Sequence, residues 1–162
     1  MKKLISISLI LLVCLSLFSC NEKSIELKVI DENGETGETI IPTSTGKITV
    51  INFWGVWCPY CLYEMPELDK LATNYEGTVD VIAVHTYTYS DKAPEFIEEN
   101  FKDSKIIFAS DNGGDELYTK LGGTTSYPYT VVLDQNGNMI KSFFGAKDYE
   151  YFESSFKHLI EK

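Results

Sequence analysis

Two cysteines separated by two residues form the part of this sequence best suited to covalent chemistry. Cys58 and Cys61 lie in the segment Trp57-Cys58-Pro59-Tyr60-Cys61, where an apolar run gives way to helical spacing. At positions i and i+3 of a first helical turn, two sulfurs come within disulfide reach without distortion of the backbone. The unpaired N–H groups of a helix N-terminus favour a thiolate. We therefore expect a solvent-facing Cys58 that forms a mixed disulfide and a more buried Cys61 that resolves it.

Other uses of a cysteine pair fit the sequence less well. A structural zinc site needs four ligands, and the sequence offers neither a second cysteine pair nor clustered histidines. Covalent haem attachment needs a histidine directly after the second cysteine, where this sequence has Leu62. A purely structural disulfide at this spacing would close a very short loop and constrain the unfolded chain little. The pair is therefore predicted to be redox-active, with no metal and no cofactor.

The composition places this pair in a single acidic globular domain. The 162 residues are 44% hydrophobic and carry 24 acidic against 14 basic side chains, for a net charge of −10. All of these basic residues are lysines, because the sequence contains no arginine. Arginine is the preferred side chain for binding phosphate groups, so we exclude a nucleic-acid partner.

The N-terminal residues have the composition of an export signal. Two lysines follow Met1, and an apolar run from Leu4 to Phe18 is too short to span a bilayer but suits a signal peptide. The run ends in Leu17-Phe18-Ser19-Cys20, which resembles the bacterial lipobox. The resemblance implies a signal peptide at residues 1–19, a lipidated Cys20 in a tether at 20–24, and a domain at 25–162. An uncleaved anchor is the alternative, and both readings place the domain outside the cytoplasm, beside a membrane.

The elements that must position the cysteine pair can be read from hydrophobic periodicity and turn residues. We predict strands at Ile25–Val29, Lys47–Trp54, Val79–Val84, Lys105–Ala109, Tyr129–Leu133 and Met139–Phe144. We predict helices from Pro59 to about Tyr75, at Ala93–Lys102 with Asp91 as its cap, at Asp115–Leu121, and after Asp148. Strands that alternate with helices indicate an α/β fold with a central mixed β-sheet flanked by helices on both faces. The cysteine pair then lies at the carboxyl end of a buried strand, where active sites of such sheets gather.

Residues 46–66, Gly-Lys-Ile-Thr-Val-Ile-Asn-Phe-Trp-Gly-Val-Trp-Cys-Pro-Tyr-Cys-Leu-Tyr-Glu-Met-Pro, resemble the thioredoxin-like proteins of the TlpA/ResA type. The similarity continues through Pro128 and the Asp134-Gln135-Asn136-Gly137 turn, and covers about residues 25–160. Proteins of this type are membrane-tethered, extracytoplasmic thiol–disulfide oxidoreductases. The resemblance thus implies a thioredoxin-like fold, with Cys58 as the nucleophile and Cys61 as the resolving thiol.

The resemblance also implies a role for an acid near the cysteine pair. Glu64 matches the acid that these proteins carry one turn beyond the second cysteine, and from position i+3 its carboxylate could accept or relay the proton of Cys61. The alternative is an ordinary solvated helix carboxylate. Asn52 stands where cytoplasmic thioredoxins carry a buried aspartate, so the proton relay through that aspartate is absent here.

A substrate groove is implied beside the pair. Pro128 resembles the cis-proline that faces the cysteines and leaves the preceding backbone free to pair with an extended substrate. Tyr127 departs from the Gly-Val-Pro-Thr string that is frequent in the family. The predicted groove residues are Trp57, Pro59, Tyr60, Tyr127 and Pro128. His85 ends a predicted strand near the same sheet edge, and we leave open whether it approaches the site or is a core or surface histidine.

Together these features predict a thiol–disulfide oxidoreductase, lipid-anchored to a bacterial membrane, that reduces disulfides of exported proteins. By the resemblance, its partners would include apocytochrome c during cytochrome c maturation and a membrane thiol carrier that supplies electrons. A disulfide-forming oxidase is an alternative, because the direction depends on the reduction potential. A thiol peroxidase of the peroxiredoxin type is disfavoured because it needs an arginine. A non-catalytic module that docks extended peptides is the remaining alternative.

Overall fold

The computed structural model describes residues 24–111 and 115–161. The predicted signal peptide at 1–19 and the lipidation site Cys20 lie outside these ranges. Over the described ranges, none of the helices combines the length and the apolar character needed to cross a bilayer.

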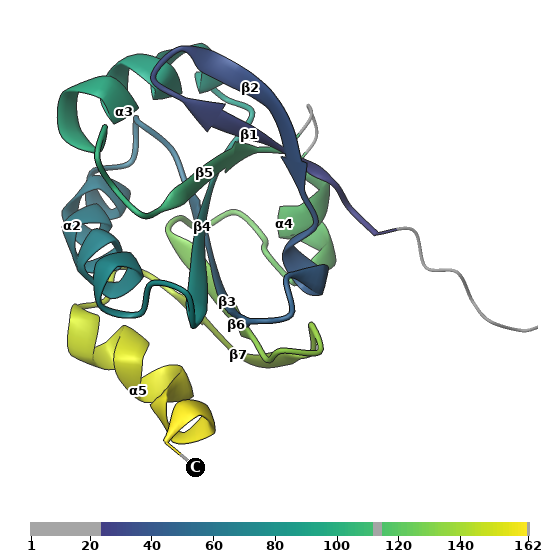
Figure 1. Ribbon diagram of the computed structural model, residues 1–162. Helices are drawn as coiled ribbons and strands as arrows, with labels where there is room; N and C mark the ends of the chain where they lie inside the picture. Colours follow the sequence, from purple (N-terminus) through teal and green to yellow (C-terminus); the bar gives the residue numbers. More distant parts are fainter. Residues whose placement is uncertain (1–23, 112–114, 162) are drawn as a thin grey trace, which may run out of the picture.

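A mixed sheet forms the centre of the fold (Figure 1). Seven strands of the described chain follow the order β2-β1-β5-β4-β3-β6-β7. The three central strands β3, β4 and β5 run parallel to one another, and the outer strands pair antiparallel. The strands are β1 (Leu27–Asp31), β2 (Gly34–Ile40), β3 (Ile48–Trp54), β4 (Val79–His85), β5 (Ile107–Ser110), β6 (Tyr129–Leu133) and β7 (Met139–Phe144).

The N-terminal hairpin corrects one part of the sequence prediction. We predicted a single strand at Ile25–Val29, whereas β1 runs from Leu27 to Asp31 and pairs with β2, which was not predicted. The side chain of Asp31 accepts a hydrogen bond from Asn33 N at 2.7 Å in the turn between the two strands. β2 lies at the edge of the sheet, and its residues are mostly exposed on both faces. Its sequence therefore lacks the alternation of apolar and polar residues that reveals a half-buried strand.

The strand β3 is buried along its whole length, as its apolar sequence predicts. Its side chains alternate between two core clusters on opposite faces of the sheet. Val50 and Trp54 belong to one cluster, and Ile51 and Phe53 belong to the other. Asn52 shares the face of Val50 and Trp54, so its polar side chain points into a core.

Four helices cover the two faces of the sheet in the described chain (Figure 1). They are α2 (Pro59–Asn74), α3 (Ala93–Asn100), α4 (Glu116–Lys120) and α5 (Tyr149–Ile160), and short 3-10 turns lie at η1 (Pro42–Ser44) and η2 (Ser90–Lys92). Buried side chains of α2, α3 and α5 share the cluster of Val50, whereas those of α4 join the cluster of Ile51. Helices therefore lie on both faces, which confirms the predicted fold class.

The helix caps agree with the sequence prediction for α5 and not for α3. Asp148 caps α5, because its Oδ1 accepts a hydrogen bond from Tyr151 N at 2.9 Å. Asp91 does not cap α3 as predicted. It lies within η2, and the N-cap of α3 is Lys92, which forms no side-chain cap. The extra turn before α3 displaces the aspartate from the capping position.

Candidate active site

The cysteine pair lies directly after the carboxyl end of β3. Cys58 is the N-cap of α2 in an extended conformation, and its Sγ accepts a hydrogen bond from Cys61 N at 3.2 Å. Cys58 and Cys61 form a disulfide with their Cα atoms 5.2 Å apart. Pro59 occupies the first turn of the helix, where a missing N–H costs nothing. The strand–loop–helix unit thus places both sulfurs at the helix N-terminus, as the spacing predicted.

The exposure of the pair differs from the sequence prediction. Cys61 is fully buried, as expected, but Cys58 is only 4% exposed and is not a solvent-facing residue in this disulfide state. Both cysteines belong to the core cluster beneath α2. The indole of Trp57 folds back over the preceding backbone, since a Cβ added to Gly55 would lie 2.6 Å from Trp57 Nε1. A side chain at position 55 would therefore displace this tryptophan from the site.

Glu64 is a buried acid on α2. Its side chain is fully buried, so it is not a solvated helix carboxylate. Its Oε1 accepts a hydrogen bond from Asn52 Nδ2 at 2.6 Å, and its Oε2 accepts one from Lys147 N at 3.0 Å. Burial raises the pKa of Glu64 from 4.5 to about 7, although both hydrogen bonds lower the pKa. Glu64 therefore changes charge close to neutral pH, one helical turn from Cys61.

The partners of Glu64 come from other segments of the chain. Asn52 on β3 also donates a hydrogen bond through Nδ2 to Thr130 Oγ1 on β6, at 3.0 Å. Within the described residues, Asn52 Oδ1 has no hydrogen-bond partner. Lys147 lies in the loop between β7 and α5, and its Nζ donates hydrogen bonds to the backbone carbonyls of Phe144, at the end of β7, and of Gly145. In the sequence, Asn52 showed only that the buried aspartate of cytoplasmic thioredoxins is missing. In the structure, Asn52 binds a different buried acid, Glu64.

An apolar groove lies beside the pair. It has a volume of about 780 Å³ and is lined by Pro59, Tyr60, Tyr63, Tyr127, Gly145 and Ala146. The Tyr127–Pro128 peptide bond is cis, in agreement with the family resemblance, and Gly145 N donates a hydrogen bond to Pro128 O at 2.9 Å. Two of the predicted groove residues, Trp57 and Pro128, do not line the groove. Pro128 is buried, and Trp57 packs edge-on against the ring of Tyr127, with ring centroids 5.5 Å apart.

Three groove residues were not predicted from the sequence. Tyr63 is 75% exposed and lies one helical turn beyond Tyr60, which is 71% exposed. Helical spacing from Tyr60 would have found it. Gly145 and Ala146 come from the loop after β7, far from the cysteines in sequence, and no local pattern marks them.

His85 is a fully buried residue at the end of β4. Its Nδ1 lies 2.6 Å from Thr86 O, and its Nε2 accepts a hydrogen bond from Val56 N at 3.1 Å. Burial lowers the pKa of His85 from 6.5. The sequence left open whether His85 is a core histidine or approaches the cysteine pair. His85 is a hydrogen-bonded core histidine, and it also contacts the loop before Cys58.

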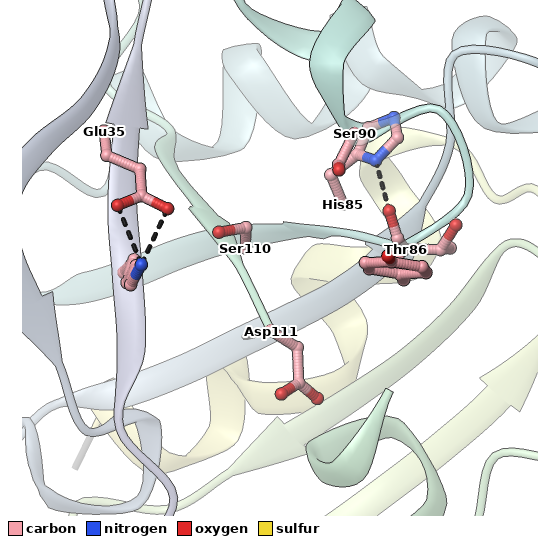
Figure 2. A pocket seen from close by; sticks show the side chains of 8 residues that line it. Glu35, His85, Thr86, Ser90, Ser110 and Asp111 are labelled. Carbon is pink, nitrogen blue, oxygen red and sulfur yellow. Dashed lines mark hydrogen bonds and ion pairs between the residues drawn. The ribbon is translucent and has the colours of Figure 1, made fainter. Parts of the chain in front are cut away.

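A second, polar cavity of about 230 Å³ is lined in part by His85 (Figure 2). Figure 2 shows His85, Thr86 and Ser90 on one side and Glu35 on the other, with Asp111 below. Lys28 and Glu35 form an ion pair of 2.8 Å at its rim. Across residues 24–111 and 115–161, no three His, Cys, Asp or Glu side chains are arranged to hold a metal ion.

The sheet order, the disulfide at the start of α2 and the cis-proline define this chain as a thioredoxin-like protein. Solved structures agree at the level of the fold. The exposed lipoprotein thioredoxin Etrx1 of Streptococcus pneumoniae aligns with a TM-score of 0.68 at 19% identity, over 82% of this chain and 98% of that chain. StoA of Bacillus subtilis aligns with a TM-score of 0.64 at 21% identity, over 82% and 97%.

Sequence comparison identifies the family. Residues 24–160 match the family model described as Redoxin, and the chain belongs to this family. A thiol-disulfide oxidoreductase ResA of Bacillus thuringiensis subsp. konkukian is 30% identical over 115 residues, which are 70% of this chain and 64% of that protein. The ResA of Halalkalibacterium halodurans is 27% identical over 147 residues, 90% of this chain and 80% of that protein. The chain thus spans somewhat less than two thirds of the first of these relatives.

Proposed function

We propose that this protein is a thiol–disulfide oxidoreductase. The observation that carries the proposal is the Cys58–Cys61 disulfide at the N-terminus of α2, beside a groove lined by Pro59 and by Tyr127 of the cis Tyr127–Pro128 bond. A disulfide in this place constrains the unfolded chain little, so a structural role is a poor explanation for it. The names of the ResA relatives support the same activity.

The reduced protein would transfer two electrons to a substrate disulfide in two exchanges. The Cys58 thiolate attacks one substrate sulfur, forming a mixed disulfide and releasing the other substrate sulfur as a thiolate that takes up a proton from water. Cys61 then loses its proton, and its thiolate attacks Cys58 Sγ. This attack forms the Cys58–Cys61 disulfide and releases the second substrate thiolate, which is protonated in turn. The Cys58–Cys61 disulfide of the structure corresponds to the oxidised protein that these two exchanges would produce.

Glu64 is proposed as the group that accepts the proton of Cys61. A pKa of about 7 suits a general base that works near neutral pH. The test is stopped-flow kinetics of the Glu64→Gln variant, which keeps the size and shape of the side chain but cannot accept the proton. We expect resolution of a mixed disulfide above about pH 7 to slow by about 10-fold or more. Traces that superimpose on those of the wild type at every pH would exclude this role.

The groove is proposed to hold the substrate segment around its cysteine. Pro59, Tyr60 and Tyr127 border it, and the ring of Trp57 packs against that of Tyr127. An extended chain would pair with the backbone of Tyr127, which precedes the cis bond to Pro128. Exposed aromatic rings provide contact area for an unfolded segment at low conformational cost. A folded substrate with a recessed disulfide would not reach Cys58, so the expected substrates are extended polypeptides.

The proposed setting is outside the cytoplasm, with the protein lipid-anchored to a bacterial membrane. The lipobox-like Leu17–Cys20 segment supports a lipid anchor at Cys20, and the structurally similar pneumococcal protein Etrx1 is itself an exposed lipoprotein. The substrates would be exported proteins with disulfides, apocytochrome c among them, and the electrons would come from a membrane thiol carrier. The net charge of −10 gives no attraction to anionic lipid, so lipidation would be needed for stable attachment.

The experiment that tests activity and direction combines a redox titration with trapping. A Cys61→Ala variant should accumulate mixed disulfides with substrates through Cys58, and Cys58→Ser should accumulate none. Titration of the pair against a glutathione buffer should give a potential of about −250 mV or lower for a reductant, whereas about −120 mV would indicate an oxidase. Failure to trap any partner together with an unreactive Cys58 would contradict the proposal and favour a peptide-docking module. Peroxide consumption by the purified protein would favour a thiol peroxidase.

A further inference from the structure

His85 stands out among the buried groups that the exchange chemistry does not use. It lies at the end of β4, whereas the reactive sulfur of Cys58 lies at the N-cap of α2. The ring forms a T-shaped contact with that of Trp54, with ring centroids 4.7 Å apart, and is fully buried. Its two nitrogens are both engaged, one with Thr86 O and the other with the backbone N–H of Val56.

The hydrogen bonds fix the tautomer of the ring. A carbonyl oxygen can only accept, so Nδ1 carries the proton that it donates to Thr86 O at 2.6 Å. Nε2 then keeps its lone pair and accepts from Val56 N at 3.1 Å. The fixed ring therefore presents an acceptor to the loop that leads from β3 to Cys58. Desolvation lowers the pKa of His85 and so supports this neutral form.

The loop between Trp54 and Cys58 is short, so Val56 and Cys58 cannot move independently. On one side Thr86 N donates a hydrogen bond to Trp54 O at 2.9 Å, and on the other Cys58 N donates to Gly55 O at 2.9 Å. The bond to His85 fixes the residue between them. The contact of Cys61 N with Cys58 Sγ depends on the extended conformation of Cys58 at the N-cap. That contact is the one that stabilises a thiolate.

We propose that His85 is a positioning residue that holds the active-site loop through Val56 and thereby sets the reactivity of the Cys58 thiolate. Its hydrogen bonds go to the backbone of Val56 and Thr86, so it acts on the sulfur through the loop. The inference rests on the proposed role of Cys58 as the attacking thiol. Without the acceptor, the Val56 N–H would have to turn toward another partner, and Cys58 would leave the geometry in which the helix N–H groups support its negative charge.

The test compares two substitutions of the same residue in the reduced protein. His85→Gln keeps a carbonyl acceptor at about the reach of Nε2, and His85→Phe keeps a ring without one. We expect the rate of Cys58 alkylation by iodoacetamide near neutral pH to fall about fivefold in His85→Phe and to stay within about twofold in His85→Gln. The potential of the pair should become more negative in His85→Phe, because its reduced form loses thiolate stabilisation. His158→Phe, at the exposed histidine of α5, is the matched control and should change neither value.

The outcomes separate this inference from the proposed function. If mass spectrometry shows that Cys58 is not the alkylated thiol of the wild type, the proposed function fails. If Cys58 is reactive but His85→Phe leaves its rate and potential unchanged, or His85→Gln behaves like His85→Phe, the positioning role is wrong. Should His85→Phe not fold, the wild type decides by NMR. A scalar coupling across the hydrogen bond between Val56 N and His85 Nε2, with slow exchange of the Val56 amide, supports the inference, and their absence overturns it.

Discussion

Glu64 is a carboxyl group that lies inside the core and has a pKa near neutral. A buried carboxylate is costly unless it is hydrogen-bonded, and the neutral acid is then favoured. Asn52 and the backbone of Lys147 offset part of that cost by donating hydrogen bonds to the two carboxylate oxygens. The balance leaves the pKa at about 7 rather than far above it. A fully apolar pocket would keep the acid neutral, and a solvated site would keep it charged.

This balance predicts how stability depends on pH. Between the unfolded pKa of 4.5 and the folded pKa of about 7, the folded protein binds more protons at Glu64 than the unfolded chain. The free energy of unfolding should therefore fall as the pH rises through this window, by about 3 kcal/mol from this group. Urea unfolding of the wild type and of Glu64→Gln at about pH 5 and about pH 8 measures it.

The variant comparison is needed because His85 acts in the opposite direction. Its lowered pKa means that the unfolded chain binds more protons, so this group destabilises the fold as the pH falls below 6.5. Both proteins contain His85, and the difference between them isolates Glu64. An equal pH dependence of the unfolding free energy in wild type and Glu64→Gln would show that Glu64 has the same pKa in the folded protein as in the unfolded chain.

Helix α2 has two working faces. Its inner face carries Cys61 and Glu64 into the core, and its outer face presents Tyr60 and Tyr63 to the groove. The loop after β7 contacts both faces of the helix. Lys147 N donates a hydrogen bond to Glu64 on the inner face, and Gly145 and Ala146 line the groove with the tyrosines of the outer face. The proposed reacting centre and the proposed substrate site therefore share their supporting elements.

The outer face yields a prediction about substrate binding. Tyr63→Ser should raise KM for reduction of an unfolded disulfide-containing polypeptide by about 5- to 10-fold, because one exposed ring leaves the groove. The rate with a small disulfide such as oxidised glutathione should stay the same, since it does not fill the groove. Tyr87→Ser, at another exposed tyrosine that lines the polar cavity, is the control. An unchanged KM for the polypeptide would remove Tyr63 from the binding surface.

The site is built from segments spread over most of the chain. Asn52, Glu64, Thr130 and Lys147 come from β3, α2, β6 and the loop before α5, and they meet around one carboxyl group. The two core clusters lie on opposite faces of the same sheet and share β3 as their centre. The active site should therefore not be able to unfold separately from the rest of the domain.

Cooperative unfolding is the corresponding prediction. Urea transitions followed by tryptophan fluorescence, which senses Trp54 and Trp57, and by far-UV circular dichroism should coincide. Val50→Ala, in the middle of β3, should lower the free energy of unfolding by about 2 kcal/mol with both probes. Glu38→Ala on the exposed edge strand β2 should change it by less than about 0.5 kcal/mol. A fluorescence transition that precedes the loss of secondary structure would contradict this.

The local sequence determined the cysteine pair, the buried strand that leads to it and the alternation of strands and helices. These follow from short-range periodicity and from two sulfurs one helical turn apart. The sequence did not predict β2, because the residues of this strand are mostly exposed on both faces and carry no periodic signal. The predicted cap at Asp91 was wrong because a 3-10 turn separates this residue from the start of α3. Tertiary structure alone decided that Cys58 is nearly buried, that burial raises the pKa of Glu64 to about 7, and that His85 accepts a hydrogen bond from Val56. Each of these depends on burial and on contacts between residues distant in sequence, and none can be read from the order of neighbouring residues.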